Sequence, residues 1–388
     1  MPFYVKHGQM PPKRHTVLRK PDGGIYYEEL IGNKGFTGIS SILYRINRPT
    51  EITNIQPLKD LQWEAHGDSR LRPRHLRLLG LPEGGSPTLD RTPVMFNGDV
   101  GILFSRPTVQ DEHFYRNGQA DEILYVADGE GTLETPLGFL PYRRGDYVVI
   151  PRGIAYRMRM KENAPHNLLI TESRGEVRTP SRYRNEHGQL VEGAPFSERD
   201  IVVPEDLHTF DETGEFKVVV KQYEALHEIT VKNHPFDVVG WDGYFYPWTF
   251  NIENFEPIVG RIHQPPPIHQ TFQGDGFVVC SFCPRPYDFD DNAVPAPYHH
   301  SNVMSDEVLF YASKDFMSRK GVEYGSVTLH PDGLPHGPHP GKAEASIGKT
   351  YTDELAVMID TFRPLHVAKS AAVVEDEQYY QSWLETTA

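Results

Sequence analysis

The sequence predicts an all-β-dominated fold that contains two small β-barrels and one short helix near the C-terminus. The 388 residues include 33 Gly and 33 Pro, which is typical of a turn-dense β architecture rather than of a helical one. From Asn97 onward, short β-prone runs alternate with Gly or Pro turns. Because 388 residues are many for a single core, we expect two domains, 1–245 and 246–388.

Runs rich in β-branched and aromatic residues mark the expected strands. Strands beside Gly turns are expected within residues 20–30 and 35–46. The strands of the first barrel are expected where turns separate ILYV, GTLET, GDYVVIP and YRMRM, at residues 123–126, 131–135, 145–151 and 156–160. The second barrel is expected over 250–362. A closing helix is expected over 376–385, because the aromatic and Leu side chains of DEQYYQSWLE recur at helical spacing.

Two segments of the first barrel resemble cupin proteins. Residues 145–153 (GDYVVIPRG) resemble the second cupin motif, and residues 121–129 (DEILYVADG) resemble the end of the first. The positions where a metal-binding cupin carries histidines are occupied by Phe114, Arg116 and Tyr156. We therefore expect a degenerate N-terminal barrel with a structural role, in which Glu122 is a leftover of the lost site or a packing residue.

Composition excludes several classes of function. The net charge of −14 argues against nucleic acid as a partner. The chain has no run of 18 apolar residues and no signal-peptide core, which predicts a cytoplasmic protein with no membrane partner. Cys280 and Cys283 have no second pair to complete a zinc site, so we expect them in the core. The most basic stretch, residues 61–79, is expected to be a solvated face or a subunit contact.

A His/acid/His set in the second barrel is the strongest candidate for chemistry. His300, Glu307 and His336 follow one another within 37 residues. Two imidazoles and one carboxylate on one face of a metal are the ligands of non-heme Fe(II) oxygenases, because they leave positions open for reactants. A DE-(I/V)-L-(Y/F) run occurs at 121–125 and again at 306–310, but only the second has histidines on both sides. The pair of barrels therefore indicates a duplication with one metal-binding half.

Neighbouring residues leave alternatives open in this set. Asp306 precedes Glu307 and His299 precedes His300, and adjacent strand residues point to opposite faces. Glu307 is favoured because it leads the apolar run VLFY. His339 could replace His336, although we expect His339 and also His330 to be pocket residues or neighbours of the ligands. The competing interpretation is that these histidines lie in a polar surface loop.

Three long segments are similar to the homogentisate 1,2-dioxygenase family. They are PYHHSNVMSDE at 297–307, LPHGPHPG at 334–341 and NHPFDVVGWDGYFYPWTFNIENF at 233–255. The resemblance covers most of the chain and is strongest after residue 235. It implies a protein of two cupin-like parts that uses Fe(II) and O₂ to cleave the ring of a hydroquinone-type aromatic acid, homogentisate or a close relative, in aromatic (tyrosine) catabolism. It also implies a homo-oligomer, a trimer or a hexamer.

The resemblance assigns roles to individual positions. It implies that His300, Glu307 and His336 are the iron ligands and that Tyr298 lines the pocket. Asn302 would support the ligand strand. It places the catalytic histidine, a general base or proton donor at the substrate hydroxyl, at His263. From the residues alone His269 is as good a candidate for that role, since both stand in IHQPPPIHQ.

The sequence also departs from the family. One extra residue precedes the acidic ligand, which keeps Asp306 open. The substrate-contacting tyrosine of the family falls on Phe316, so a hydrogen bond to the acidic side chain of the substrate would be lost. Two other functions compete with ring cleavage. One is a cupin isomerase or hydrolase that uses zinc or manganese, and the other is a non-catalytic bicupin that binds a sugar or another ligand.

Overall fold

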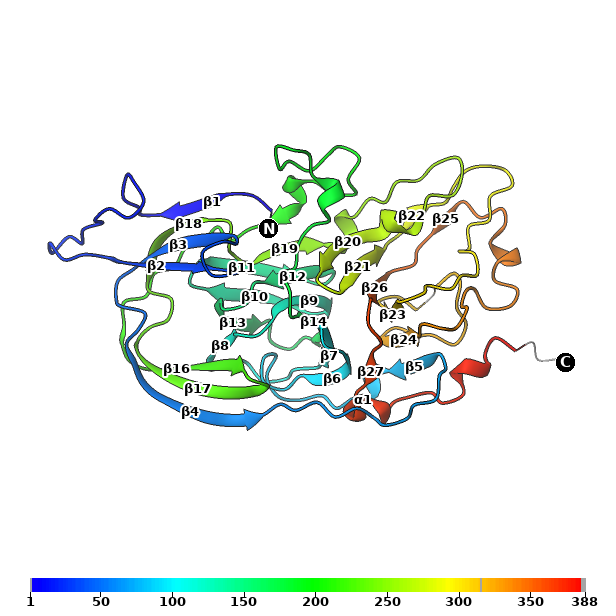
Figure 1. The fold of residues 1–388 in the computed structure, drawn as a ribbon, viewed down its shortest axis with the longest axis horizontal. Coiled ribbons are helices and arrows are strands. Elements are labelled where there is room, and N and C mark those ends of the chain that lie inside the picture. Colours follow the sequence, from blue (N-terminus) through cyan, green and yellow to red (C-terminus); the bar gives the residue numbers. More distant parts are fainter. Residues whose placement is uncertain (1, 315, 385–388) are drawn as a thin grey trace.

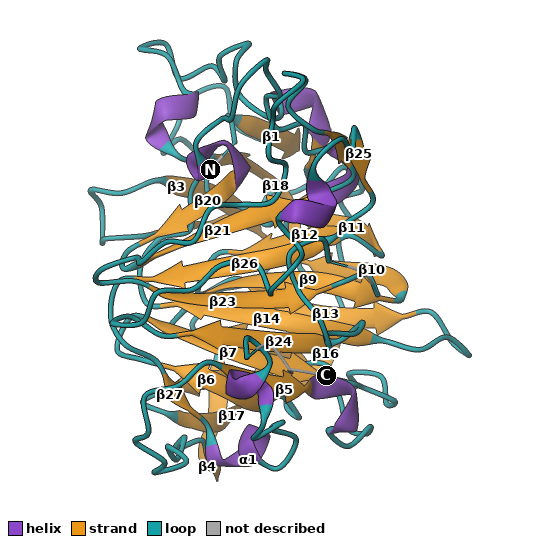
Figure 2. Cartoon of the chain, turned by 90° about the vertical axis from the view of Figure 1, so that its right-hand side faces the viewer, coloured by secondary structure: helices purple, strands orange, loops and turns teal. Residues whose placement is uncertain are grey.

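The computed structural model describes residues 2–314 and 316–384, and most of its regular structure is β-strand (Figures 1 and 2). The strands form sheets of four, seven, eight, six and two members. The one α-helix among the described residues is α1, Lys369–Ala372. The predicted all-β-dominated fold with one short helix is thus confirmed, although α1 precedes the segment where the closing helix was expected. No helix in the described part of the chain is long and apolar enough to cross a membrane.

Two large sheets and one small sheet make up most of the N-terminal half. The seven-stranded sheet contains, in spatial order, β11 (Gly138–Arg143), β10 (Glu130–Thr135), β13 (Ala155–Met160), β8 (Phe114–Asn117), β16 (Thr213–Gln222), β17 (Ala225–Asn233) and β4 (Ile52–Asp60). The eight-stranded sheet contains β15 (Ile201–Val202), β19 (Trp248–Asn251), β12 (Asp146–Ile150), β9 (Asp121–Asp128), β14 (Asn167–Ser173), β7 (Val100–Ser105), β6 (Thr92–Phe96) and β27 (His366–Val367). The four-stranded sheet contains β1 (Val5–Gly8), β18 (Val238–Gly243), β3 (Ser40–Arg45) and β2 (Tyr27–Gly32).

The C-terminal half contributes the sheet that carries the candidate site. The six-stranded sheet contains β20 (Gln270–Gly274), β21 (Phe277–Phe282), β26 (Ala356–Thr361), β23 (Asp306–Tyr311), β24 (Ser326–His330) and β5 (Arg74–Arg77). A two-stranded sheet pairs β22 (Arg285–Pro286) with β25 (Tyr351–Thr352). Short 3-10 turns lie at Leu78–Gly80, Ser181–Tyr183, Glu198–Asp200, Ile252–Asn254, Pro266–His269, Glu344–Ser346 and Tyr379–Gln381. Strands predicted at 123–126, 131–135, 145–151 and 156–160 are present as β9, β10, β12 and β13.

The eight-stranded sheet is the middle layer of the molecule, between the seven-stranded and the six-stranded sheets (Figure 1). On one face Glu122 of β9 bonds to Tyr156 of β13. On the other face Tyr125 of β9 packs on Phe310 of β23, with ring centroids 6.1 Å apart. A strand covered on both faces needs no polar side. This explains why β12, DYVVI, is buried at every position.

The six-stranded sheet has one face in the main core and one face toward a cavity. On β23, Val308 and Phe310 belong to the main core, while Leu309 and Tyr311 belong to a second apolar cluster. The alternation follows from the pleat, which directs successive side chains to opposite faces. Glu307 therefore lies on the same face as Leu309 and Tyr311. This face is the floor of the candidate site.

Each half of the chain supplies an edge strand to the other. β5 comes early in the sequence but pairs with β24 in the six-stranded sheet. β27 comes late but pairs with β6 in the eight-stranded sheet. Arg74, the first residue of β5, and Arg72 just before it are buried and bond to Glu375 at 2.9 Å. The expectation of a solvated basic face or subunit contact is therefore wrong for these two arginines, which join distant parts of the same chain.

The C-terminal segment is less helical than predicted. Within 376–385, Tyr379–Gln381 forms a 3-10 turn, and residue 385 lies outside the described residues. The amides of Ser382 and Leu384 bond to carbonyls three residues earlier, at 3.0 and 2.9 Å. Such i→i+3 bonds are typical of 3-10 geometry rather than of an α-helix. The segment still places Tyr379 and Trp383 against the histidines behind the candidate site.

Candidate metal centre and its cavity

His300, Glu307 and His336 form a compact cluster. One ligand atom from each lies within 4.8 Å of the other two. Glu307 Oε2 is 3.9 Å from Nε2 of His300 and 3.5 Å from Nε2 of His336. Glu307 is held by β23, and the two histidines are held together by a backbone bridge, in which each amide bonds to the carbonyl of the other at 2.8 and 2.9 Å. The fold thus brings together the three residues that the sequence singled out.

The hydrogen bonds of the two imidazoles leave the Nε2 atoms available. Nδ1 of His300 lies 3.0 Å from the carbonyl of Tyr298, and Nδ1 of His336 lies 3.5 Å from the carbonyl of Leu334. A carbonyl only accepts, so in each neutral ring Nδ1 carries the proton and Nε2 has a free lone pair. Nε2 of His336 is buried and has no hydrogen-bond partner among the described residues. Two such nitrogens and a carboxylate fit a divalent metal of the iron type.

The surroundings keep Glu307 ionised. Burial alone would raise its pKa, but the neighbouring imidazoles of His300, His330 and His336 outweigh burial and hold the pKa of Glu307 well below its usual value. The proximity of the Glu307 carboxylate also raises the pKa of His300. The guanidinium of Arg319 lies 3.6 Å from Oε1 of Glu307 and is itself buried. A charged carboxylate is the form that binds metal.

Asp306, the alternative acidic residue, faces away from the cluster. Its two carboxylate oxygens accept the backbone amides of Asp332 at 2.8 Å and Leu365 at 2.7 Å. The alternation of β23 therefore gives the two neighbouring acids different environments. His299, the alternative to His300, is exposed and lies outside the cluster.

His330 and His339 lie behind the cluster and do not line the cavity. Nδ1 of His330 is 2.8 Å from Oε1 of Glu307, and its ring is fully buried. Nε2 of His339 is 2.7 Å from the Ser382 hydroxyl, and its ring stacks on Trp383 at 4.0 Å. Burial lowers the pKa of each to about 4. The C-terminal segment thus packs on neutral imidazoles, one of which contacts Glu307.

Two further groups near Glu307 carry no signal in the sequence motifs. Arg319 lies in the loop before β24 and donates to the Gly337 carbonyl at 2.8 Å. Asp360 of β26 is the cross-strand neighbour of Glu307. Burial and the charge of Glu307 raise the pKa of Asp360 to about 8. The position of Asp360 could be predicted only from the register in which the strand AVMID pairs with β23. The sequence does not reveal this register.

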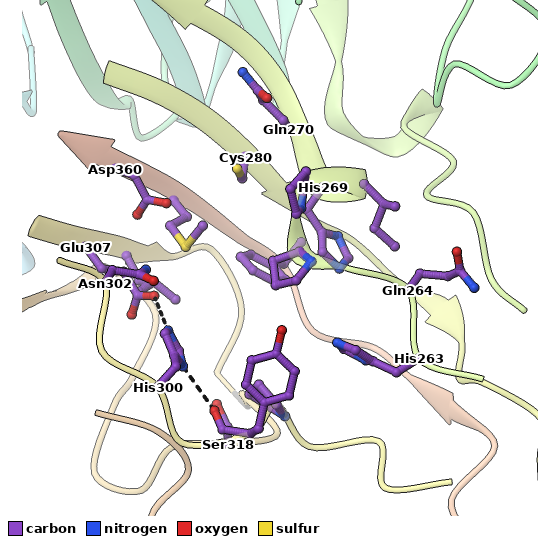
Figure 3. A pocket seen from close by; sticks show the side chains of 18 of the residues that line it. His263, Gln264, His269, Gln270, Cys280, His300, Asn302, Glu307, Ser318 and Asp360 are labelled. Atoms are coloured by element: carbon purple, nitrogen blue, oxygen red, sulfur yellow. Dashed lines mark hydrogen bonds and ion pairs between the residues drawn. The ribbon is translucent and has the colours of Figure 1, made fainter. Parts of the chain in front are cut away.

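A cavity of about 680 Å³ opens in front of the cluster (Figure 3). Figure 3 shows His300 and Glu307 on one side and His263 on the other, with the His263 imidazole directed toward the side that holds His300. Its lining includes Tyr298, Phe316, Asn302, His269, Cys280 and Asp360. This volume is within the range of small-molecule sites.

The two candidate histidines for proton transfer differ in environment. His263 is half-exposed, and its Nδ1 lies 3.8 Å from Oδ2 of Asp288. Its ring also meets the ring of Tyr298 edge-on, with centroids 5.2 Å apart. His269 is buried against Phe282, and burial lowers the pKa of His269 to about 3. Tyr298 is 55% exposed, so it forms the rim of the cavity rather than its floor.

Both cysteines are free and buried, as expected. Cys280 faces the cavity floor, and burial raises its pKa well above the usual value. Cys283 donates to the carbonyl of Phe255 at 3.1 Å. Neither thiol is ionised near neutral pH, so neither is a nucleophile or a metal ligand in this state.

The N-terminal half holds a buried polar network where the C-terminal half holds the cluster. Glu122 is fully buried and bonds to Arg91 at 2.5 Å, to Tyr156 at 2.6 Å and to Asn117 at 3.1 Å. Among residues 2–314 and 316–384, the three-residue cluster at His300 is the one group with metal-ligand geometry. Tyr156, at one of the positions where a histidine is missing, thus bonds to Glu122 within this network.

Comparison with known proteins identifies relatives along almost the whole chain. The profiles of the homogentisate 1,2-dioxygenase N-terminal and C-terminal domains match residues 99–252 and 264–387. A protein of Saccharolobus solfataricus, named provisionally as a dioxygenase, is 42% identical over 386 residues, or 99% of each chain. The homogentisate 1,2-dioxygenase of Bradyrhizobium diazoefficiens is 27% identical over 290 residues, or 70% of this chain and 63% of that enzyme. The chain thus spans less than two thirds of that relative.

Solved structures with barrel domains also match. A cupin 2 conserved barrel domain protein from Leptotrichia buccalis is 9% identical, with a TM-score of 0.35, over 78% of this chain and 99% of that one. The sequence relatives place the chain in the dioxygenase class of oxidoreductases. Within that class, the chain belongs to the homogentisate 1,2-dioxygenase family. The resemblance found in the sequence is thereby confirmed.

Proposed function

We propose that the protein is an Fe(II)-dependent ring-cleaving dioxygenase whose substrate is a hydroquinone, homogentisate or a close relative. The observation that carries the proposal is the cluster of His300, Glu307 and His336, whose free Nε2 atoms and ionised carboxylate lie beside a cavity of about 680 Å³. When bound by these three residues, iron would supply the Lewis acidity and redox chemistry that dioxygen requires. Membership of the family supports the same reaction class.

The chain itself supplies proton transfer and a partly dry site. His263 lines the cavity opposite His300 and accepts the proton of a phenolic hydroxyl. The carboxylate of Asp288 lies 3.8 Å from Nδ1 of the His263 ring. His269 is a poor acceptor near neutral pH, because its pKa is about 3. Apolar side chains on the cavity floor exclude water from the ring that reacts.

We also propose that the protein is a homo-oligomer, a trimer or a hexamer. The family resemblance supports this assembly, and so does β4 at the edge of the seven-stranded sheet. All nine residues of β4 are exposed, and its edge includes the apolar side chains of Ile52, Ile55 and Leu58. Exposed apolar edge strands are sites of association. Analytical ultracentrifugation tests this proposal, and a monomer at micromolar concentration would contradict it.

The test of the reaction is oxygen uptake by protein reconstituted anaerobically with Fe(II). Homogentisate, gentisate and hydroquinones are supplied in parallel, and product absorbance is followed with uptake. We expect uptake and a ring-cleaved product with at least one hydroquinone, and loss of both in His300→Ala. Metal-dependent isomerisation or hydrolysis without uptake would replace the proposal. No uptake by protein with stoichiometric iron would refute it.

A further inference from the structure

The cavity floor below the metal cluster is apolar two residues further along β23 from Glu307. Register across the six-stranded sheet places Val278, Asp360 and Glu307 in one row. Two residues further along β23, the next row consists of Cys280, Met358 and Leu309. Because side chains two residues apart on a strand share one face, the second row lies next to the cluster on the face that carries Glu307.

Phe316 forms the wall beside this second row. Its ring packs edge-on against Phe282 at 5.8 Å and Tyr311 at 5.1 Å. It is 7% exposed and belongs to one apolar cluster with Cys280, Leu309 and Met358. The hydroxyl of Tyr311 bonds instead to Thr328 at 2.9 Å. This wall therefore offers surface to a hydrocarbon and no donor to a carboxylate.

The two guanidiniums that line the cavity each lie beside a carboxylate of the chain. Arg285 bonds to Glu354 at 2.8 Å and to the Cys283 carbonyl at 3.0 Å. Arg319 is held by the Gly337 carbonyl and lies 3.6 Å from Glu307. Among the described lining residues these are the two guanidiniums, and none is a lysine. Two further acids, Asp288 and Asp360, also line the cavity, and a carboxyl group supplies no positive charge.

The lining histidines do not replace a missing cation at the floor. His269 is buried and its pKa is about 3, so its ring is neutral at physiological pH. His263 is half-exposed at the rim, and Asp288 stands beside it. An anionic substituent that reached the apolar row would lose water without gaining a partner, which costs far more than burial of a hydrocarbon.

We propose that the substrate is a hydroquinone whose ring substituent is neutral and apolar, such as a short alkyl chain, rather than a carboxylate-bearing side chain. This inference rests on the proposed function and narrows its substrate class. The inference is based on the position of the metal cluster beside two apolar features of the cavity. These are the wall formed by Phe316 and the row of Cys280, Met358 and Leu309. A cavity of about 680 Å³ holds the ring together with a chain of several carbons.

The first experiment compares binding and turnover for a matched series. Fe(II)-loaded protein is titrated anaerobically by calorimetry with propylhydroquinone, unsubstituted hydroquinone, homogentisate and gentisate, and kcat/KM is then measured by oxygen uptake. We expect propylhydroquinone to bind and turn over about 100-fold better than homogentisate. Equal or tighter binding of homogentisate or gentisate overturns the inference. Absence of uptake with every compound refutes ring cleavage, while the anaerobic affinities still decide the substrate class.

The second experiment introduces a cation at the wall. Phe316→Arg should raise the affinity for homogentisate relative to propylhydroquinone by about tenfold or more, since the carboxylate gains a charged partner. Phe36→Arg is the matched control, because the Phe36 side chain is 90% exposed in the loop between β2 and β3. Iron content and the thermal midpoint show that each variant is folded. If a folded Phe316→Arg leaves the ratio unchanged, the wall does not select the substituent. Phe316→Tyr repeats the measurement of the affinity ratio with a neutral hydroxyl, rather than a cation, at the wall.

Discussion

Two adjacent carboxylates, Asp306 and Glu307, should give opposite results when each is converted to its amide. Asp306→Asn keeps the shape of the side chain but places an NH₂ group against one of the amides of Asp332 and Leu365. A buried hydrogen bond to a charged acceptor contributes about 1.5–3 kcal/mol, and an unpaired buried donor costs about 1–3 kcal/mol. We expect the free energy of unfolding to fall by about 3 kcal/mol while Fe(II) binding stays stoichiometric.

Glu307→Gln should instead remove the metal. Glu307 Oε2 lies 3.5 Å and 3.9 Å from the free nitrogens of His336 and His300, and the neutral amide lacks the charge that a divalent cation requires. Changes next to a ligand cost about 10- to 100-fold in metal affinity, so loss of the ligand itself should exceed that range. Anaerobic Fe(II) titration and urea denaturation of the metal-free proteins provide the two readouts. If Asp306→Asn loses iron at unchanged stability and Glu307→Gln retains iron, the assignment of faces on β23 is wrong.

Three further changes test the surroundings. His330→Phe removes the contact to Glu307 and should lower Fe(II) affinity about 10- to 100-fold, which a metal titration measures; unchanged affinity would make His330 a packing residue only. The pKa of His269 is about 3 in the folded protein and 6.5 in the unfolded chain, so between these values only the unfolded state binds the proton. Stability should therefore be complete above pH 6.5 and fall by up to about 1.4 kcal/mol per unit as pH drops toward 3, and urea midpoints should show a shallower slope in His269→Phe. Arg91→Met leaves Glu122 as an unpaired buried charge, which should cost about 3–5 kcal/mol with iron content unchanged; lost iron at wild-type stability would link this network to the metal.

The β-rich fold was predictable because its signals are local. Gly and Pro turns between short apolar runs place β9, β10, β12 and β13 without any knowledge of their partners. The three residues of the metal cluster were also predictable, since spacing and resemblance single them out before their geometry is known. The choice between Asp306 and Glu307 depended on the pleat, and the apolar run VLFY indicated the correct face.

Long-range pairing accounts for what the sequence did not reveal. Arg319 and Asp360 reach Glu307 through a loop and through strand register, and no motif marks either of them. The buried pairing of Arg72 and Arg74 with Glu375 joins positions about 300 residues apart, where the local composition indicates only a basic surface. The segment expected to be helical over 376–385 forms i→i+3 hydrogen bonds instead. A helix this short is only marginally stable by itself, so tertiary packing rather than helical periodicity determines its conformation.

The exchange of β5 and β27 has a consequence for how the chain matures on the ribosome. β6 ends at residue 96 and lacks its outer neighbour until residues 366–367 have been synthesised, so this edge of the middle layer stays open throughout that interval. β5, by contrast, is made early and waits for β24. Neither half can therefore complete its sheets before the other half has been synthesised. A nascent chain that stalls before β27 exposes the edge of β6, which pairs readily with another chain.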